Sequence, residues 1–211
     1  MRLTVFGATG GTGRLLVDQA LAAGHQVTAV VRRSWPDPEH PRLRVVVGDV
    51  TDPSSLPPTM EGVDAVLSGL GSTRAARPTR VYSAGATAIL ATMKDLGVRR
   101  LVAITALPIA PGEQQDALHH RLVNPLLHRF FGGAYQDMRR MEGILAGSDR
   151  DWTVFRPPYL RDGPATGTCR SAVDAPLPRA WTLRRADLAA AMLAAVTDDR
   201  LVRRAVNVAA S

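Results

Sequence analysis

Four glycines stand within seven residues near the start of the chain, at Gly7, Gly10, Gly11 and Gly13. They follow the apolar run Leu3–Phe6 and precede an amphipathic stretch that is closed by Gly24. A strand, a glycine loop and a helix start in this order can bind a pyrophosphate, because glycines allow close backbone approach and the helix N-terminus offers free N–H groups. Hydroxyls of Thr9 and Thr12 can add hydrogen bonds. We therefore predict a pyrophosphate site at this loop; the alternative is a tight turn that binds nothing.

The end of the second expected strand, residues 26–31, indicates which dinucleotide the loop would bind. An acidic residue at this position hydrogen-bonds the ribose hydroxyls of NAD, whereas an arginine accommodates the 2′-phosphate of NADP. Here Arg32 and Arg33 follow the strand, and no carboxylate occurs until Asp37. The fixed fork of guanidinium donors suits a phosphate. We predict NADP, with NADPH preferred over NADH; the alternative is that both arginines are ordinary surface residues.

Two further strand ends are expected to line the cofactor site. Asp49 and Val50 follow the expected third strand, where a carboxylate can accept from the adenine amino group and Val50 can pack on the ring. The alternative is that Asp49 caps a turn. Gly69, Leu70 and Gly71 follow the fourth strand, where the backbone must pass close beneath the cofactor.

The reacting end of the cofactor should lie farther along the same sheet edge. Ligands bind at the carboxyl ends of parallel strands, so Thr105 and Ala106 after the fifth strand, and Pro157 and Tyr159 after the sixth, should flank the nicotinamide. Thr105 and Tyr159 are candidate catalytic residues. Tyr159 can donate a proton or form an aromatic wall.

Tyr135 is a further candidate acid, because Arg139 stands four residues beyond it on the same expected helix face. The spacing is similar to the Tyr-x-x-x-Lys pair of short-chain dehydrogenases, in which the cation lowers the tyrosine pKa and the tyrosine protonates the substrate oxygen. The alternative is an aromatic residue at a helix start beside a solvated arginine.

These residues must be positioned by short, continuous apolar strands that alternate with amphipathic helices. Such alternation indicates an α/β fold, a Rossmann-like doubly wound parallel β-sheet with helices on both faces. We expect one domain over residues 1–211, in which a small C-terminal lip from about residue 157 completes the substrate crevice. The strands are expected at residues 3–6, 26–31, 43–47, 64–68, 100–104, 152–155, about 168–173 and 205–208. The main helices are expected at 14–21, 78–96, 134–147 and 186–197. Residues 107–134, rich in Pro, Gly and His, are expected to be irregular.

Composition limits the classes of function. The net charge of +7 could suggest nucleic acid as a partner, but of the 26 Lys and Arg residues only Lys94 is lysine, and the arginines are scattered. We expect a small-molecule substrate and no nucleic acid or membrane partner; the oligomeric state, monomer or dimer, is left open. No apolar run approaches the roughly 20 residues that span a bilayer, and no signal peptide is evident. Cys169 is the only cysteine, which fits a reducing cytoplasm.

Three histidines, His119, His120 and His128, raise the question of a metal site. No carboxylate or cysteine is spaced to complete it, and Arg121 and Arg129 stand beside two of them. We expect a solvated face and no metal.

Taken together, these motifs resemble the atypical short-chain dehydrogenase/reductases of the NAD(P)H-binding, NmrA-like type, and within them the flavin reductase/biliverdin-IXβ reductase family. The resemblance covers almost the whole chain and rests on residues 6–13, 31–32, 46–50, 70–71, 93–94, 97–98, 157–158 and 163–167. It implies an NADP-type cofactor, with Arg32 near the 2′-phosphate and Asp49 near the adenine, and hydride transfer to planar acceptors.

The chain departs from these relatives at the substrate end. Biliverdin reductases carry Thr-Ser after the fifth strand and Pro-Pro-His after the sixth, where this chain has Thr105-Ala106 and Pro157-Pro158-Tyr159. A tetrapyrrole substrate is therefore not supported. The leading hypothesis is an NADPH-dependent oxidoreductase acting on a planar aromatic, flavin- or quinone-like molecule. The alternatives are a redox sensor that binds NADP(H) without turnover, with residues 107–134 as its interaction surface, and an epimerase or cyclase.

Overall fold

The computed structural model describes residues 1–36, 39–71, 79–112 and 124–211. Among them, eight strands form one sheet in the order β3-β2-β1-β4-β5-β6-β10-β8, and every neighbouring pair is parallel except β10 with β8. The strands are β1 (Arg2–Phe6), β2 (Gln26–Val31), β3 (Leu43–Val47), β4 (Ala65–Ser68), β5 (Arg100–Ile104), β6 (Asp151–Arg156), β8 (Arg170–Val173) and β10 (Arg204–Ala209). A second, two-stranded sheet pairs β7 (Tyr159–Arg161) with β9 (Thr182–Arg184) in parallel.

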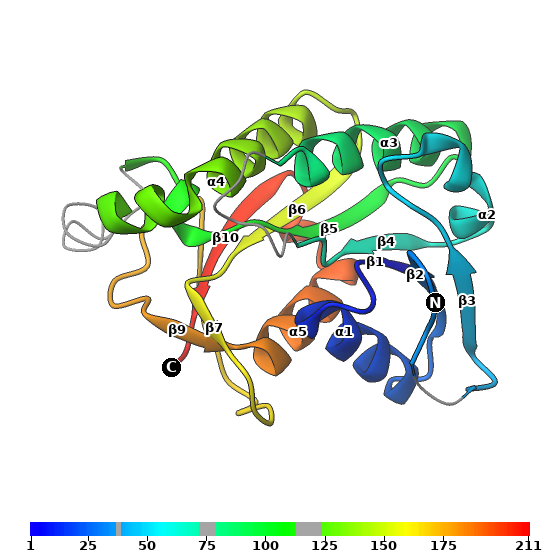
Figure 1. Ribbon diagram of the computed structural model, residues 1–211. Helices are drawn as coiled ribbons and strands as arrows, with labels where there is room; N and C mark the ends of the chain where they lie inside the picture. The colour runs from blue at the N-terminus through cyan, green and yellow to red at the C-terminus, as the bar shows by residue number, and fades with distance from the viewer. Residues whose placement is uncertain (37–38, 72–78, 113–123) are drawn as a thin grey trace.

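Helices cover both faces of the main sheet (Figure 1). On one face lie α1 (Gly11–Ala22) and α5 (Arg185–Ala194); on the other lie α3 (Val81–Asp95) and α4 (Asn124–Ala146). The short α2 (Pro57–Met60) and several 3-10 turns complete the described helical segments.

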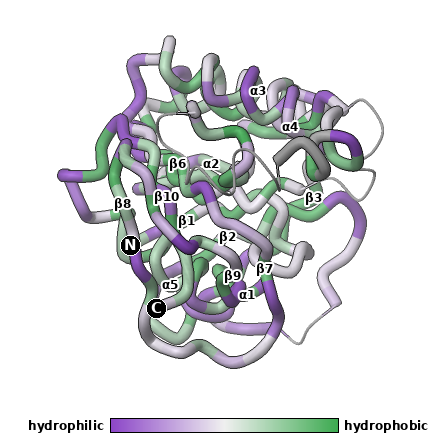
Figure 2. Tube along the Cα trace, turned by 90° about the vertical axis from the view of Figure 1, so that its left-hand side faces the viewer, coloured by the Kyte–Doolittle hydropathy of each residue, from purple (hydrophilic) through white to green (hydrophobic). Residues whose placement is uncertain are grey.

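The two faces explain why the strands are apolar throughout. In β5, Val102 packs with residues of α1 and α5, whereas Leu101 and Ala103 pack with residues of α3 and α4. Successive strand side chains point to opposite faces, so a sheet covered on both sides needs apolar residues at every position. Figure 2 shows the hydrophobic colours concentrated along the inner strands and the hydrophilic colours on peripheral loops. The predicted fold class is confirmed.

Helix α4 is a correction to the sequence prediction. The helix was expected only from about residue 134 to residue 147, after an irregular stretch over residues 107–134, but it begins at Asn124. Pro125 falls in the first turn, where its missing N–H has no intrahelical partner to lose. Gly132 and Gly133 lie within the helix, each at a cost of about 1 kcal/mol relative to alanine. Packing of the apolar face of α4 against the sheet outweighs these local preferences.

The expected C-terminal lip divides into two parts. β8 and β10 join the main sheet, and the β7–β9 pair stands apart from it beside the start of α5 (Figure 1). The pairing of Tyr159 with Thr182 was not predicted, because each strand is only three residues long. β7 and β9 thus carry the segment after Pro157 away from the main sheet.

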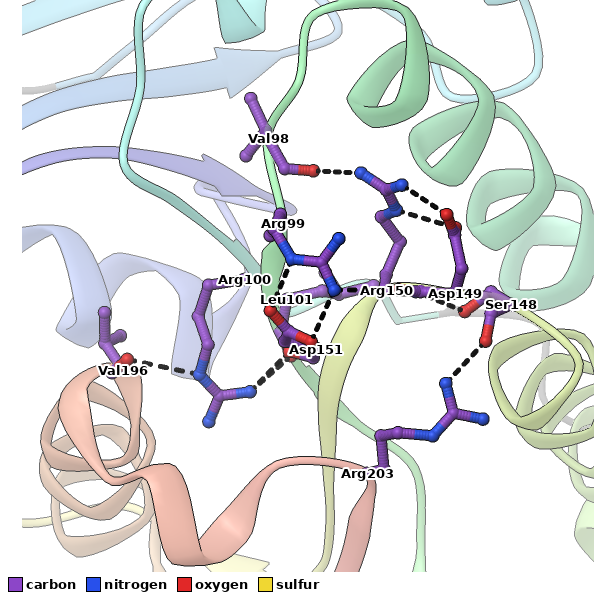
Figure 3. Close-up of polar contacts among 10 residues, drawn as sticks. All are labelled: Val98, Arg99, Arg100, Leu101, Ser148, Asp149, Arg150, Asp151, Val196 and Arg203. Atoms are coloured by element: carbon purple, nitrogen blue, oxygen red, sulfur yellow. Dashed lines mark hydrogen bonds and ion pairs between the residues drawn. The ribbon is translucent and has the colours of Figure 1, made fainter.

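A cluster of arginines fixes the amino ends of β5 and β6, the sheet edge opposite the glycine loop (Figure 3). Arg99 pairs with the Asp151 carboxylate at 2.9 Å. Arg100 donates from Nη2 to the Ala195 carbonyl at 2.6 Å and from Nη1 to the Asp151 carbonyl at 2.6 Å. Arg100 thereby places a cation on the carbonyls at the end of α5, where the helix dipole favours it. This end of the sheet is a structural support.

Candidate functional site

The glycine loop connects β1 to α1, and two of its glycines are required by the protein's own backbone. A Cβ on Gly7, whose φ is +68°, would lie 2.6 Å from the Gly69 carbonyl oxygen. A Cβ on Gly13 would lie 2.0 Å from the Gly7 oxygen. These glycines let the start of α1 pack directly on the ends of β1 and β4. Gly69 completes the contact by donating its N–H to the Phe6 carbonyl at 2.9 Å.

The start of α1 remains open toward solvent. Gly10 is the N-cap and supplies no side-chain cap, and the first turn holds no acidic residue. Thr9, Gly10 and Gly11 are exposed, whereas Thr12 is buried. The first N–H groups of a helix have no intrahelical acceptor, and together with the helix dipole they form an anion site. The geometry fits the diphosphate of a dinucleotide.

The carboxyl ends of β2 and β3 bring Arg32 and Asp49 together, as the sequence predicted from separate segments. Val31 pairs with Val47, and the next N–H, of Gly48, donates to the Val31 oxygen at 2.9 Å. Arg32 and Arg33 are exposed, and neither guanidinium forms a hydrogen bond or ion pair with any residue that the structure describes. Both are therefore available to an anionic ligand.

Asp49 also has a structural role. Its Oδ1 accepts from the Thr51 N–H at 2.8 Å and from the Thr51 hydroxyl at 2.7 Å. These hydrogen bonds, with a smaller contribution from the charge of Arg32, lower the pKa of Asp49 from its ordinary value. The alternative interpretation of Asp49, that it caps a turn, is therefore correct for its Oδ1 atom. Oδ2 accepts no hydrogen bond from the described part of the chain, which leaves it for a ligand.

Val50 and Leu70 meet over α3. A Cβ on Gly85 of α3 would lie 2.8 Å from Leu70 Cδ1 and 3.3 Å from Val50 Cβ. Val50 is buried, and Leu70 is half-buried at the carboxyl end of β4. A Cβ on Gly71 would meet no described atom within 4 Å. The two side chains form an apolar floor next to Asp49.

At the predicted nicotinamide end, the Thr105 hydroxyl is already engaged. It donates to Glu142 Oε1 of α4 at 2.7 Å, and Thr105 is 3% exposed. The Glu142 carboxylate also receives the Arg156 guanidinium, at 3.0 Å from Nε and 2.6 Å from Nη2. This buried ion pair ties α4 to the ends of β5 and β6. Glu142 and Arg156 were not predicted from the sequence. The one feature that could have indicated them is the charged Arg156 directly before Pro157.

Tyr135 does not have the electrostatics that its proposed catalytic role requires. Its side chain is buried in the cluster that contains Tyr82, and burial raises the pKa of Tyr135 to about 12. The proposed pair with Arg139 requires a lowered pKa, but Arg139 is exposed and is not among the groups that shift the tyrosine. The burial of Tyr135 favours the alternative of an aromatic residue packed in the core over an acid with Arg139 as its activating cation.

Tyr159 and Pro157 lie where β6 gives way to β7. Pro157 is buried, and its carbonyl accepts from the Leu107 N–H at 2.8 Å, next to half-buried Ala106. Tyr159 is 75% exposed. Of the two predicted phenols, Tyr159 is the one accessible to a ligand from solvent.

Two absences hold for the part of the chain that the structure describes. Its residues include no group of three or more His, Cys, Asp or Glu placed to hold a metal ion. His119, His120 and the side chain of His128 lie outside the described residues. No described helix combines the length and apolarity needed to cross a bilayer.

A separate cavity of about 270 Å³ opens at the amino ends of β1, β2 and β3. Its lining includes Arg2, Arg42 and Arg44 together with Glu61. It is remote from the carboxyl ends of the strands, where parallel sheets bind ligands.

Three known proteins illustrate what the chain is similar to. A photosystem II assembly factor, Ycf39, from Guillardia theta is 28% identical over 170 residues, which cover 74% of this chain and 46% of that protein. The 3-diazoavenalumate denitrifying reductase of a Streptomyces species is 29% identical over 187 residues, or 81% of this chain and 59% of that protein. The chain thus spans about half the length of these relatives.

The third is the structure of a Veillonella parvula short-chain dehydrogenase/reductase in complex with NADP, which has a TM-score of 0.83 and 16% sequence identity. The superposed region covers 99% of this chain and 94% of the Veillonella chain, so the two proteins share a fold. The family model described as NAD(P)H-binding matches residues 7–199, from the first loop glycine to the segment before β10. The chain therefore belongs to the NAD(P)H-binding family.

Proposed function

We propose that this protein is an NADPH-dependent reductase that transfers hydride to a planar aromatic, flavin- or quinone-like small molecule. The observation that carries the proposal is that one sheet edge holds both an uncapped helix start and the exposed Arg32, whose guanidinium forms no hydrogen bond or ion pair with any described residue. An NADP-sized ligand presents a diphosphate and a 2′-phosphate to these two sites. Family membership supports the dinucleotide, and Arg32 supports the choice of NADPH over NADH.

The protein's own groups have limited roles in this reaction. The bound nicotinamide supplies the hydride. The main chain of the glycine loop and Arg32 bind and orient the cofactor; the Glu142–Arg156 pair holds Thr105 and the neighbouring strand ends in place. Tyr159 is accessible for donating a proton from its Oη or for stacking its ring on the acceptor. Reduction of a quinone-like acceptor needs little beyond such positioning, because protons can also come from solvent.

A second function, NADP(H) sensing without turnover, is favoured by one observation. Two of the three proposed catalytic residues do not present a free hydroxyl to a substrate: the Thr105 hydroxyl donates to Glu142, and Tyr135 is buried. The similarity to an assembly factor is consistent with a role that does not require catalysis.

A turnover assay separates the two functions. The protein is mixed with NADPH and, in turn, with FMN, FAD, menadione and a benzoquinone, and loss of the reduced nicotinamide absorbance is followed. We expect steady oxidation with at least one acceptor beyond the rate without protein. Tight binding of NADPH with no turnover on any acceptor would refute the reductase and support the sensor.

Two substitutions at Tyr159 define its role. Tyr159→Phe keeps the ring and removes the hydroxyl, whereas Tyr159→Ala removes both. Loss of kcat in both variants indicates a proton donor. Full activity in Tyr159→Phe with a raised acceptor KM in Tyr159→Ala indicates a stacking surface, and full activity in both removes Tyr159 from the reaction.

A further inference from the structure

Arg185, the first residue of α5, lies directly over the start of α1. A Cβ placed on Gly11 would be 3.0 Å from both Cδ and Nε of Arg185. Gly11 is the first residue of α1 and is exposed beside its uncapped N-terminus. The guanidinium of Arg185 therefore stands at the same opening that we propose for the diphosphate. No motif in the sequence pointed to this residue.

The position of Arg185 is fixed by the way α5 packs on α1. Gln19 of α1 donates from Nε2 to the Ala186 carbonyl at 2.9 Å, which holds the first turn of α5 against α1. Leu183 and Leu188, on either side of Arg185, are buried in the cluster that includes Leu16. The backbone of Arg185 thus cannot move without disturbing the core.

Among the described residues, one carboxylate pairs with the guanidinium, on one side of it. Nη1 of Arg185 lies 2.6 Å from Oδ1 of Asp162, and the Arg185 side chain is 28% exposed, against 89% for Asp162. An arginine has five N–H donors in a planar fork, so the edge formed by Nε and Nη2 remains for a second anion. Nε is also the nitrogen that lies against Gly11. An exposed pair of this kind contributes at most about 1 kcal/mol, so it does not prevent Arg185 from binding a phosphate.

The same turn of α5 anchors the segment that follows β7. Asp187 accepts from the Thr166 N–H at 2.7 Å and from the Gly167 N–H at 3.1 Å, and Arg184 donates to the Pro164 carbonyl at 2.8 Å. With Asp162 on Arg185, residues 162–167 are attached to α5 at three points. Of these three side chains, Arg185 is the one placed against Gly11 of the glycine loop.

We propose that Arg185 is a diphosphate-binding residue that bridges the cofactor to Asp162 and so couples nucleotide binding to the segment that follows Tyr159. This inference rests on the proposed binding of NADP. The phosphate oxygens engage the Nε edge while Nη1 keeps Asp162. Residues 159–167 are then held more tightly when the nucleotide is bound.

The binding test uses two ligands, NADP⁺ and adenosine 2′-monophosphate, titrated by calorimetry into the native protein and into Arg185→Gln. Adenosine 2′-monophosphate carries the phosphate expected at Arg32 but has no diphosphate. Because a hydrogen bond to a charged group contributes about 1.5–3 kcal/mol, the variant should bind NADP⁺ roughly 10- to 100-fold more weakly. Its affinity for adenosine 2′-monophosphate should be unchanged.

Arg184→Gln is the matched control, since it removes the same charge one residue earlier from a side chain that faces Pro164. It should bind NADP⁺ within about threefold of the native protein, a difference of roughly 0.6 kcal/mol. Arg185→Lys keeps the positive charge but loses the planar set of guanidinium donors, so its affinity for NADP⁺ should lie between those of the native protein and Arg185→Gln. Thermal unfolding of each variant checks that the fold is retained.

The coupling is tested by hydrogen exchange in residues 159–167 with and without NADP⁺. Protection by the nucleotide is expected in the native protein and should be lost in Arg185→Gln at saturating NADP⁺. If the native protein binds NADP⁺ but Arg185→Gln binds it equally well, this inference is wrong and the proposed function stands. If the native protein binds no NADP⁺, both fail.

Discussion

Replacing Gly13 by alanine tests how the start of α1 is held against the sheet. Gly13 lies in the first turn of α1 and does not have a positive φ, so alanine is permitted by the backbone. In an unobstructed helix the change would stabilise the protein by up to about 1 kcal/mol, because glycine has the lower helix propensity. The new methyl group would, however, lie 2.0 Å from the Gly7 oxygen and 2.7 Å from the Gly7 carbonyl carbon.

The expected magnitude follows from this overlap. Ordinary contacts of a Cβ lie at 3.4–4 Å, so α1 and the loop must separate by about 1 Å or more. The obstructing atoms are backbone and cannot rotate away. Overpacking costs about 1–3 kcal/mol, and we expect the upper part of that range, a net loss of about 2 kcal/mol or more. For a chain of this length the melting temperature should fall by roughly 5–10 °C.

Circular dichroism during heating and a urea titration measure the change. Gly143→Ala is the matched control, because Gly143 is exposed in α4 and a Cβ there would meet no described atom within 4 Å. It should raise stability by about 0.5–1 kcal/mol. The two substitutions therefore have opposite predicted signs. A Gly13→Ala protein as stable as the native protein, or more stable, would refute the close packing of Gly7 and Gly13.

Three further changes test the supports of the site. Glu142→Leu leaves Arg156 buried without its carboxylate and should lower the free energy of unfolding by about 3 kcal/mol in urea titrations; an unchanged midpoint would contradict the ion pair. Burial raises the pKa of Tyr135 to about 12 from 10, so the folded state holds this proton more tightly than the unfolded chain and stability falls as pH rises through that window. Tyr135→Phe should flatten the fall, measured by urea midpoints between pH 10 and 12, and an identical slope would argue against a buried phenol. Arg100→Met removes the guanidinium that donates to the Ala195 and Val196 carbonyls at the end of α5 and should cost about 2 kcal/mol, seen as a lower melting temperature with unchanged NADPH affinity.

The arrangement of the segments at the proposed phosphate end could be predicted because these segments are local in sequence. β1, the glycine loop and the start of α1 are consecutive, and Arg32 and Asp49 each follow directly on a short apolar strand. The rule that parallel strands bind ligands at their carboxyl ends then brings these segments together. The fold class could be predicted for the same reason, because each of the alternating strands and helices is recognised from its own short stretch of sequence.

The remaining parts depend on contacts between distant segments. Thr105 meets Glu142 across 37 positions, and Arg185 reaches Gly11 from the other end of the chain. Neither contact produces a recognisable pattern in the sequence around the residues involved. Spacing alone does not show whether a tyrosine such as Tyr135 is buried, and burial decides the direction of its pKa shift.

The most direct test of the account is the ratio of the dissociation constants for NADPH and NADH, measured by fluorescence titration of the native protein and of Arg32→Gln. If the Arg32 guanidinium binds the 2′-phosphate, the native protein should prefer NADPH roughly 10- to 100-fold. Arg32→Gln should lose most of that preference while its affinity for NADH stays the same. Equal affinity of the native protein for both nucleotides, or a preference that survives in Arg32→Gln, would contradict the assignment.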